Sequence, residues 1–192
     1  SRPSVKPTHR LDPALLLELI DAGSSQHYQD ADLYDYEYRR RRDDVNFYVD
    51  TAARLAPSQA VLELGCGSGR VTLPLLRAGH EVVALDRSSP MLSQLTARAQ
   101  RLSPAAAARL TVMTGDVRGF TVRRRFPLII ACFNVLEHLY TRSEVAACLR
   151  AVRDHLAPGG RFVFDVQMPD LAWLTRDPDK RWSRTKFRHP RT

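Results

Sequence analysis

The fold is decided by the stretch Val61-Leu-Glu-Leu-Gly-Cys-Gly-Ser-Gly-Arg70, in which an apolar run ends in three glycines at alternate positions. A helical pattern follows this turn and ends at Gly79. The stretch therefore predicts a strand, a glycine-rich turn and the start of a helix. Because glycine has no Cβ atom, the backbone of such a turn can approach a ligand closely. The helix start adds unpaired N–H groups, so the turn predicts a site for a small anionic or polar cofactor.

The spacing of the glycines separates two kinds of cofactor turn. The dinucleotide fingerprint G-x-G-x-x-G would need a glycine at position 70, where the chain has Arg70. The chain instead has Glu63, Gly65, Gly67 and Gly69 at alternate positions. This pattern resembles motif I of the class I S-adenosylmethionine-dependent methyltransferases, E/D-x-G-x-G-x-G, at every fixed position.

A carboxylate follows the next apolar run. Residues 81–86 form a short buried-strand pattern that ends in Asp86, 21 residues after Gly65 (86 − 65). In a β-α-β unit this spacing puts Asp86 at the carboxyl end of the neighbouring strand, where it can accept hydrogen bonds from both hydroxyls of a ribose. The alternative is a carboxylate that caps the next helix, a role that Ser88 also fits. Residues 86–92 are similar to the D-x-S-x-x-M-L segment of the same family.

Three further stretches resemble the family in the expected order. The pattern of residues 110–117 predicts a strand that ends at Asp116. In the family that the chain resembles, the matching Asp accepts a hydrogen bond from the adenine amino group. The backbone of the next residue, here Val117, contacts the adenine ring. For Asp116 the alternative is a plain turn residue after a strand. Residues 126–139 are a continuous apolar strand that runs into polar residues, as burial on both faces requires. Residues 157–165 are similar to the L-x-P-G-G segment that opens strand five.

The resemblance covers about residues 58–170, and it implies both a fold and a cofactor. We expect a Rossmann-like class I methyltransferase fold, an α/β structure whose parallel strands lie in the order 3-2-1-4-5 with helices on both faces. The implied cofactor is S-adenosyl-L-methionine, with S-adenosyl-L-homocysteine as its product. The expected cofactor-binding residues are Glu63, Gly65, Cys66, Gly67, Gly69, Arg70, Asp86, Arg87, Met91, Asp116, Val117, Phe133 and Asn134.

Hydrophobic periodicity predicts the individual elements. Strands are expected at residues 60–65, 81–86, 110–115, 127–133 and 160–167, and helices at residues 11–22, 39–55, 69–78, 89–102 and 142–156. Strands and helices that alternate along the chain indicate a parallel sheet with right-handed crossovers. Gly23 is expected to end the first helix, and Pro74 to lie in the first turn of the 69–78 helix or to kink it.

The chain divides into three expected parts. Residues 1–57 read as an N-terminal helical cap or lid, residues 58–175 as the cofactor-binding core, and residues 176–192 as a basic C-terminal segment. Members of this family continue after strand five with an antiparallel hairpin, and this sequence has no further pair of alternating apolar runs. We therefore expect these antiparallel strands to be missing or incomplete and the sheet edge to be open. Residues 176–192, a second chain in a homo-oligomer, or native residues beyond Thr192 would cover it.

The chemistry of methyl transfer makes catalytic residues hard to find by sequence. Displacement at a sulfonium has a good leaving group, so the protein mainly positions the acceptor, and a base matters only where the nucleophile carries a proton. His138 and Glu137, after strand four, are the catalytic candidates; alternatively, His138 is an inert, hydrogen-bonded histidine in a short helix. Tyr34 and Tyr36 fit a lid that contacts substrate together with His138, or ordinary aromatic packing. Arg70 fits either the methionine carboxylate or a salt bridge.

Composition limits the other classes of function. The formal net charge is +8, with basic runs at residues 39–42 and 176–192, but no aromatic-interleaved module accompanies them, so the sequence favours solvated surfaces over nucleic-acid binding. The three cysteines lack C-x-x-C spacing and the six histidines lack ligand spacing, so we expect no disulfide and no metal in a cytoplasmic protein. No apolar run approaches the ~18 residues that a membrane span needs, and the N-terminal residues show no apolar signal segment.

The sequence therefore predicts an enzyme that transfers a methyl group from S-adenosylmethionine to a nitrogen or oxygen atom of a small molecule. One alternative is a nucleic-acid methyltransferase, although adenine-N6 enzymes of that class carry an N/D/S-P-P-Y/F/W motif where this chain has Asn134-Val-Leu-Glu137. The other alternative is a non-catalytic module with a methyltransferase-like fold. The complete glycine motif and Asp86 argue against that reading.

Overall fold

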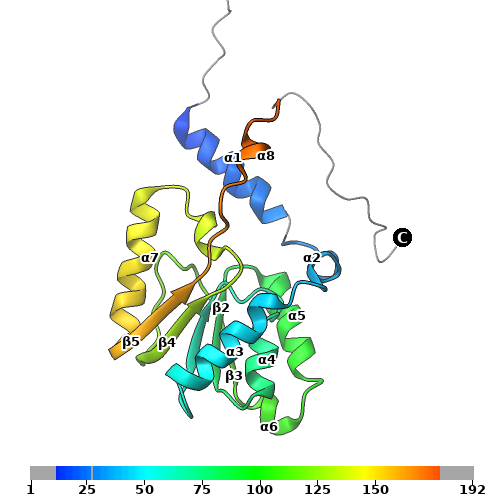
Figure 1. The fold of residues 1–192 in the computed structure, drawn as a ribbon, viewed down its shortest axis with the longest axis vertical. Helices are drawn as coiled ribbons and strands as arrows, with labels where there is room; N and C mark the ends of the chain where they lie inside the picture. The colour runs from blue at the N-terminus through cyan, green and yellow to red at the C-terminus, as the bar shows by residue number, and fades with distance from the viewer. Residues whose placement is uncertain (1–11, 27, 178–192) are drawn as a thin grey trace, which may run out of the picture.

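The computed structural model describes residues 12–26 and 28–177, which form a parallel sheet with helices packed on both faces (Figure 1). The sheet has five strands in the order β3-β2-β1-β4-β5, which confirms the predicted order. All four strand pairs are parallel. The strands are β1 (Val61–Leu64), β2 (Val82–Asp86), β3 (Leu110–Thr114), β4 (Phe126–Ala131) and β5 (Leu156–Phe164).

The central strands are apolar along their whole length because helices cover both of their faces. Every residue of β1 is buried, and β2 and β4 are buried at all but one position each. Successive residues of β1 face opposite sides, so that Val61 packs in one core cluster and Leu62 in the other. The edge strands β3 and β5 are half-buried or exposed. This difference follows from position, because an edge strand has one neighbour instead of two.

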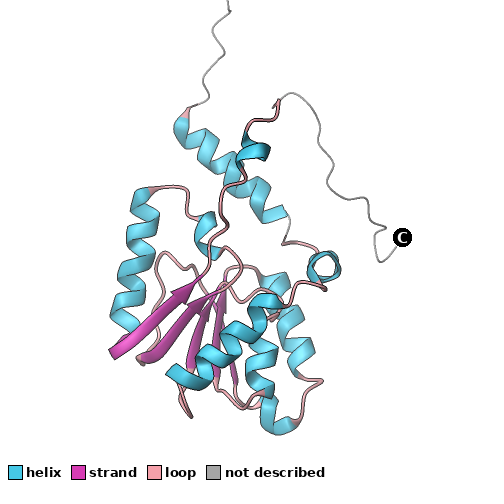
Figure 2. Ribbon diagram, in the orientation of Figure 1, coloured by secondary structure: helices cyan, strands magenta, loops and turns pink. Residues whose placement is uncertain are grey.

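The helices divide between the two faces of the sheet (Figure 2). One core cluster contains side chains of α3 (Asp43–Leu55), α4 (Thr72–Arg77) and α5 (Ser89–Ala99). The opposite cluster contains side chains of α7 (Arg142–His155). Short helices complete the connections, namely α6 (Pro104–Ala107), which was not expected, and the 3₁₀ helix η1 (Val135–His138).

Several helix boundaries differ from the sequence prediction. The helix expected at 69–78 begins at Thr72, because the glycine turn continues to residue 71. Pro74 therefore lies in the first turn, where its missing N–H costs no intrahelical bond. The helix expected to end at Gly23 is α1 (Pro13–Gln26), which continues through that glycine. One glycine costs a helix only about 1 kcal/mol, which is too little to end it.

The tyrosine-rich segment after α1 also contains a helix that the sequence pattern did not indicate. This helix, α2 (Ala31–Tyr38), begins where the Asp30 carboxylate accepts a hydrogen bond from the Leu33 N–H at 3.0 Å. The helix expected at 39–55 begins only at Asp43. Two separate helices therefore lie where the prediction had a loop and one longer helix, and the Asp30 side chain caps the first of them.

The last strand of the sheet was predicted at 160–167 but lies at Leu156–Phe164. Its beginning includes Pro158 and two glycines and has a register shift against β4. An edge strand tolerates proline because one side of it makes no ladder bonds. Within residues 12–26 and 28–177 no strand pairs with the outer side of β5, and the chain continues into the short helix α8 (Leu171–Leu174). Most of the basic segment 176–192 lies outside the described residues.

Two isoleucines test where the fold obtains its stability. Ile130 in β4 is fully buried, whereas Ile20 in α1 is 40% exposed. We expect Ile130→Ala to lower the free energy of unfolding by about 2–5 kcal/mol, because the change removes transfer energy and leaves a cavity. The matched change Ile20→Ala should cost less than about 1 kcal/mol. Urea denaturation followed by circular dichroism measures both values, and equal losses would contradict the placement of the core in this sheet.

Candidate functional site

A cleft of about 390 Å³ opens at the carboxyl ends of the strands, where the segments that follow β1, β2, β3 and β4 meet. Open parallel sheets bind their ligands at this edge. Residues from α1 and from the segment around α2 complete the wall. The lining residues are Asp21, Tyr28, Gln29, Tyr34, Gly65, Gly67, Asp86, Arg87, Ser88, Gly115, Asp116, Val117, Arg118, Cys132, Phe133, Val135, His138 and Leu139.

A second, much smaller cavity of about 30 Å³ lies at the glycine turn and shares part of its wall with the cleft. Five residues belong to both walls, namely Tyr34, Gly65, Gly67, Cys132 and Phe133. The other residues that line the small cavity are Glu63, Cys66, Ser68, Arg70 and Val71. Residues of the glycine turn thus line both cavities.

Two glycines of the turn serve different purposes. A Cβ atom on Gly65 would lie 2.5 Å from Cγ2 of Val135, so this glycine allows the segment after β4 to pack against the turn. Gly67 has a left-handed backbone (φ 54°), and a Cβ atom there would meet nothing within 4 Å. Gly67 therefore leaves open space at the cleft wall, and a ligand can approach its backbone.

Asp86 lies beside this turn, as the spacing of the motifs predicted. One carboxylate oxygen accepts a hydrogen bond from the Gly67 N–H at 2.7 Å, and the other accepts one from the Ser88 N–H at 2.8 Å. The Asp86 carboxylate thus joins the ends of β1 and β2 and belongs to the cleft wall. Ser88 is the N-cap residue of α5, so Asp86 binds an N–H that precedes the helix and not one inside it; the Ser88 side chain makes no cap hydrogen bond either.

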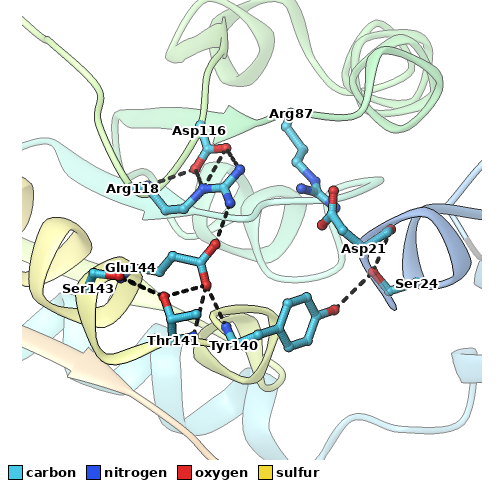
Figure 3. Close-up of polar contacts among 9 residues, drawn as sticks. All are labelled: Asp21, Ser24, Arg87, Asp116, Arg118, Tyr140, Thr141, Ser143 and Glu144. Atoms are coloured by element: carbon cyan, nitrogen blue, oxygen red, sulfur yellow. Dashed lines mark hydrogen bonds and ion pairs between the residues drawn. The ribbon is translucent and has the colours of Figure 1, made fainter. Parts of the chain in front are cut away.

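Arg118 holds the carboxylate of Asp116, and both residues line the cleft (Figure 3). Its Nε and Nη2 donate to the two Asp116 oxygens at 2.9 and 2.6 Å, and its Nη1 donates to Glu144 at 2.6 Å. The hydrogen bonds from Arg118 lower the pKa of Asp116. Glu144 also closes the capping box of α7 with Thr141. Arg118 was not among the residues predicted from the sequence. The only sequence signal for it was its position two residues after Asp116.

Two contacts attach α1 to the same side of the cleft (Figure 3). Arg87 donates to Asp21 at 2.8 Å, and the Tyr140 hydroxyl donates to the Ser24 hydroxyl at 3.0 Å. Asp21 and Arg87 both line the cleft. The expected cofactor-binding residue Arg87 therefore links the second strand to the N-terminal cap.

An aromatic group closes the cleft on the side of the N-terminal cap. The Tyr28 hydroxyl and Nε2 of His138 lie 2.8 Å apart, and the Tyr28 and Tyr34 rings have centroids 5.6 Å apart. Burial raises the pKa of Tyr28 to about 12 and lowers the pKa of His138. Burial thus favours the neutral imidazole of His138, which is hydrogen-bonded within the cleft wall. Tyr28 was not singled out in the sequence, because its partner lies 110 residues away.

Five of the expected residues line neither cavity, namely Gly69 and Asn134, which lie in the turns after β1 and β4, and the side chains of Glu137, Tyr36 and Met91. The Glu137 carboxylate is exposed and accepts a hydrogen bond from the Gln167 N–H at 2.5 Å. Tyr36 packs under the guanidinium of Arg39, 3.8 Å from its ring centroid. Met91 is fully buried in the protein interior. The structure does not bring these side chains together with His138 and Asp86.

Arg70 takes part in an ion pair that crosses to α3. Its two terminal nitrogens donate to the two Asp44 oxygens at 2.7 and 2.6 Å. Its guanidinium also lies 4.6 Å from the centroid of the Phe133 ring. Of the two interpretations that the sequence left open, the structure has the salt bridge, although Arg70 still lines the small cavity.

Phe133 and Asn134 form an unusual turn after β4. Both have left-handed backbones, with φ of 66° and 63°. Their N–H groups donate to the carboxylate of Asp165, at 2.8 and 2.6 Å, and the Tyr48 hydroxyl donates to the same carboxylate at 2.7 Å. Asp165 was not among the expected site residues, although a carboxylate directly after a strand was a usable signal.

The part of the chain that the structure describes has neither a cluster of metal ligands nor a helix that could span a membrane. Within residues 12–26 and 28–177, no group of three or more His, Cys, Asp or Glu side chains could hold a metal ion. No helix in these ranges is both long and apolar enough to cross a membrane. The three cysteines are buried and free.

Comparison with known proteins identifies a family. The family model described as methyltransferase domain matches residues 61–160, which is more than half of the chain. A curated relative is dTDP-3-amino-3,4,6-trideoxy-alpha-D-glucopyranose N,N-dimethyltransferase from Streptomyces venezuelae. It is 28% identical over 167 residues, which are 82% of this chain and 67% of the relative.

Solved structures agree with this match. The CcbJ methyltransferase from Streptomyces caelestis has a TM-score of 0.64 and 31% identity, and the match covers 71% of this chain and 56% of that one. The glycopeptide N-methyltransferase MtfA, complexed with S-adenosyl-L-methionine, has a TM-score of 0.60 and 28% identity, covering 71% of this chain and 55% of that one. The chain thus spans about half to two thirds of the length of these proteins.

The buried Glu63 in β1 gives a test by pH. It accepts a hydrogen bond from the Thr72 hydroxyl at 2.6 Å, and burial raises its pKa from the ordinary value of 4.5 to about 7. At a pH between these two pKa values, the Glu63 carboxyl group is protonated in the folded chain and ionised in the unfolded chain. The free energy of unfolding contributed by Glu63 therefore falls as pH rises from about 4.5 to about 7, by up to about 1.4 kcal/mol per pH unit, and is constant above that range.

Glu63→Gln keeps the shape of the side chain and removes this titration. We expect the variant to gain stability relative to the parent protein as pH rises from about 5 to about 8, measured by urea denaturation. Glu81→Gln serves as the control, because the Glu81 carboxylate pairs with Arg124 at the surface. Parallel pH profiles for the parent protein and Glu63→Gln would contradict the raised pKa.

Proposed function

Since the chain belongs to the methyltransferase domain family, we propose that it binds S-adenosylmethionine in the cleft and transfers the methyl group to a nitrogen or oxygen atom of a small-molecule acceptor. The observation that carries this proposal is the pairing of Gly67 with Asp86 at the cleft wall. The glycine leaves open space where a Cβ atom would be, and the carboxylate lies within 2.7 Å of its N–H. This arrangement fits a ligand with a ribose and an extended polar chain.

The residues present fit the cofactor along the whole cleft. Asp86 would accept hydrogen bonds from the ribose hydroxyls, because a carboxylate has lone pairs beyond the two that bind backbone N–H groups. Asp116 and Val117 lie on the wall beyond it and would meet the adenine ring. Five further expected residues line the small cavity and would surround the methionine end, namely Glu63, Gly65, Cys66, Arg70 and Phe133.

The cofactor supplies a sulfonium-bound methyl group that a nucleophile can take in one displacement. The chain then has to hold the acceptor in line and exclude water. An amine acceptor is protonated near neutral pH and must lose a proton before it attacks. His138 is the candidate acceptor of this proton, because burial favours its neutral imidazole. When Nε2–H donates to the Tyr28 oxygen at 2.8 Å, Nδ1 has the lone pair that takes the proton.

The comparisons favour nitrogen as the atom that is methylated. The Streptomyces venezuelae relative is named for N,N-dimethylation of an amino sugar, and the MtfA structure is titled a glycopeptide N-methyltransferase. We therefore propose an amine on a small molecule as the first acceptor class to test. A transfer assay with amino sugars and radiolabelled S-adenosylmethionine tests this choice.

The N-terminal segment is proposed to act as a lid over the site. Tyr34 of α2 lines both cavities. Asp35 of the same helix pairs with Arg98 of α5 at 2.9 Å and accepts a hydrogen bond from the Ser68 hydroxyl in the glycine turn. A helix that contacts the turn through a few polar groups can open and close without disturbing the core.

The proposed ribose contact is tested at Asp86. We expect Asp86→Ala to weaken binding of S-adenosylhomocysteine by at least about tenfold in calorimetric titration, because charge-assisted hydrogen bonds are lost. Asp154→Ala is the matched control, since Asp154 pairs only with its neighbour Arg153 in the exposed face of α7. Unchanged affinity in a folded Asp86→Ala protein would contradict the ribose assignment, and no binding to the parent protein would refute the proposed function.

The lid is tested by hydrogen exchange. We expect amide exchange in residues 28–38 to slow by at least about threefold when S-adenosylhomocysteine binds, because ligand contacts with Tyr34 favour the closed arrangement. Residues 104–107 of α6 should exchange at the same rate in both states and serve as the internal control. If exchange at residues 28–38 does not respond to bound ligand, the segment is fixed packing and not a lid.

A further inference from the structure

The turn after β4 contains two adjacent residues that are not glycine and yet have a left-handed backbone conformation. Phe133 and Asn134 both have positive φ, at 66° and 63°. Asparagine adopts this region more often than most residues, but a bulky residue such as phenylalanine does so rarely. A left-handed residue other than glycine is strained and persists only where its surroundings hold it.

The Asp165 carboxylate is the group that holds this turn. One oxygen accepts the Phe133 N–H and the other accepts the Asn134 N–H, at 2.8 and 2.6 Å. The topology explains the meeting, because Phe164 at the end of β5 is paired with Ala131 at the end of β4. The residues that follow the two strands therefore lie side by side.

Tyr48 orients the Asp165 carboxylate from the other side. Its hydroxyl donates to Oδ2 of Asp165 at 2.7 Å, and its side chain is 1% exposed in the core between α3 and the sheet. Burial raises the pKa of Tyr48, so the hydroxyl remains a donor. The turn is thus connected to the rigid core through one carboxylate and one buried phenol.

The turn positions a wall that both cavities share. Phe133 lines the cleft and the small cavity, and its ring meets Tyr38 of α2 edge-on with centroids 4.9 Å apart. Val135, the next residue after the turn, occupies the space that the absent Cβ of Gly65 leaves. A change in the turn would therefore move the aromatic wall and the residue packed on the glycine turn together.

We propose that Asp165 is a positioning residue that, oriented by Tyr48, holds the Phe133 wall in place for cofactor and acceptor. The effect on cofactor and acceptor rests on the proposed function. The hydrogen bonds from the turn to Asp165 do not depend on it. Asp165 acts through the backbone of the turn and does not itself line either cavity.

The test uses a variant and its suppressor. We expect Asp165→Ala to weaken binding of S-adenosylhomocysteine by about tenfold in calorimetric titration, because the turn loses the hydrogen bonds that hold it. Adding Asn134→Gly should recover at least about threefold of this loss, since glycine adopts the left-handed conformation without strain. Tyr48→Phe should give a smaller loss, and Asp154→Ala should give none. A loss that Asn134→Gly fails to reduce would overturn the positioning role.

A second readout needs no ligand. Amide exchange of residues 133–136 should be at least about tenfold faster in Asp165→Ala than in the parent protein, while exchange in β1 stays unchanged. Equal exchange would overturn the inference even if binding were impaired. If the parent protein bound no S-adenosylhomocysteine, the proposed function would fail, and the exchange measurement would still decide whether Asp165 holds the turn.

Discussion

The rest of the structure depends on the parallel pairing of β1 with β2 on one side and β4 on the other. In this register Leu64 lies opposite Leu85 and Ala131, so the three strands end at nearly the same level. Because parallel strands run in one direction, the glycine turn, Asp86 and the turn at Phe133 all emerge at one edge. The apolar residues within the strands hold this edge together, although they make none of its polar contacts.

The polar edge is organised in two ways that differ in rigidity. Asp86 and Asp165 are held by backbone N–H groups, whose positions are determined by the strands that they follow. Asp116 is held by Arg118, a long side chain that also has to reach Glu144. A carboxylate bound to backbone is already oriented before a ligand arrives, whereas one bound to a half-exposed arginine can change partner. We therefore expect the ribose end of the cleft to be more rigid than the adenine end.

The part of the N-terminal cap that precedes α3 is attached more weakly than the core is packed, whereas α3 itself packs in the core. The side chains of the Asp21–Arg87 ion pair are 37–40% exposed, and a pair of this kind contributes about 0–1 kcal/mol. Four large apolar side chains of α1 remain 40–53% exposed, namely Leu15, Leu16, Leu19 and Ile20. Elements that open and close are usually drawn from the least stable parts of a protein. This part of the cap has that character, and the sheet does not.

The sequence by itself determined the fold class, the strand order and the position of the main turn. A strand buried on both faces needs a continuous apolar run, and a turn close to a ligand needs glycine, so Val61–Gly69 could be interpreted from local pattern alone. The same local logic located Asp86 beside the turn, while its role in holding a ribose stays a prediction. Local signals failed at Gly23, which did not end α1, and in the tyrosine-rich segment, where the Asp30 cap starts a helix.

Only the tertiary structure decided which polar groups meet at the site. Tyr28 reaches His138 across 110 residues of sequence, Tyr48 reaches Asp165 across 117, and Arg118 reaches Glu144 across 26. It also placed Glu137, Tyr36 and Met91 away from both cavities. Hydrophobic periodicity records how each element meets the core, and it carries no information about which loops become neighbours. The neighbours are decided only when the sheet forms. Strand order and register then bring the segments that follow the strands to one edge.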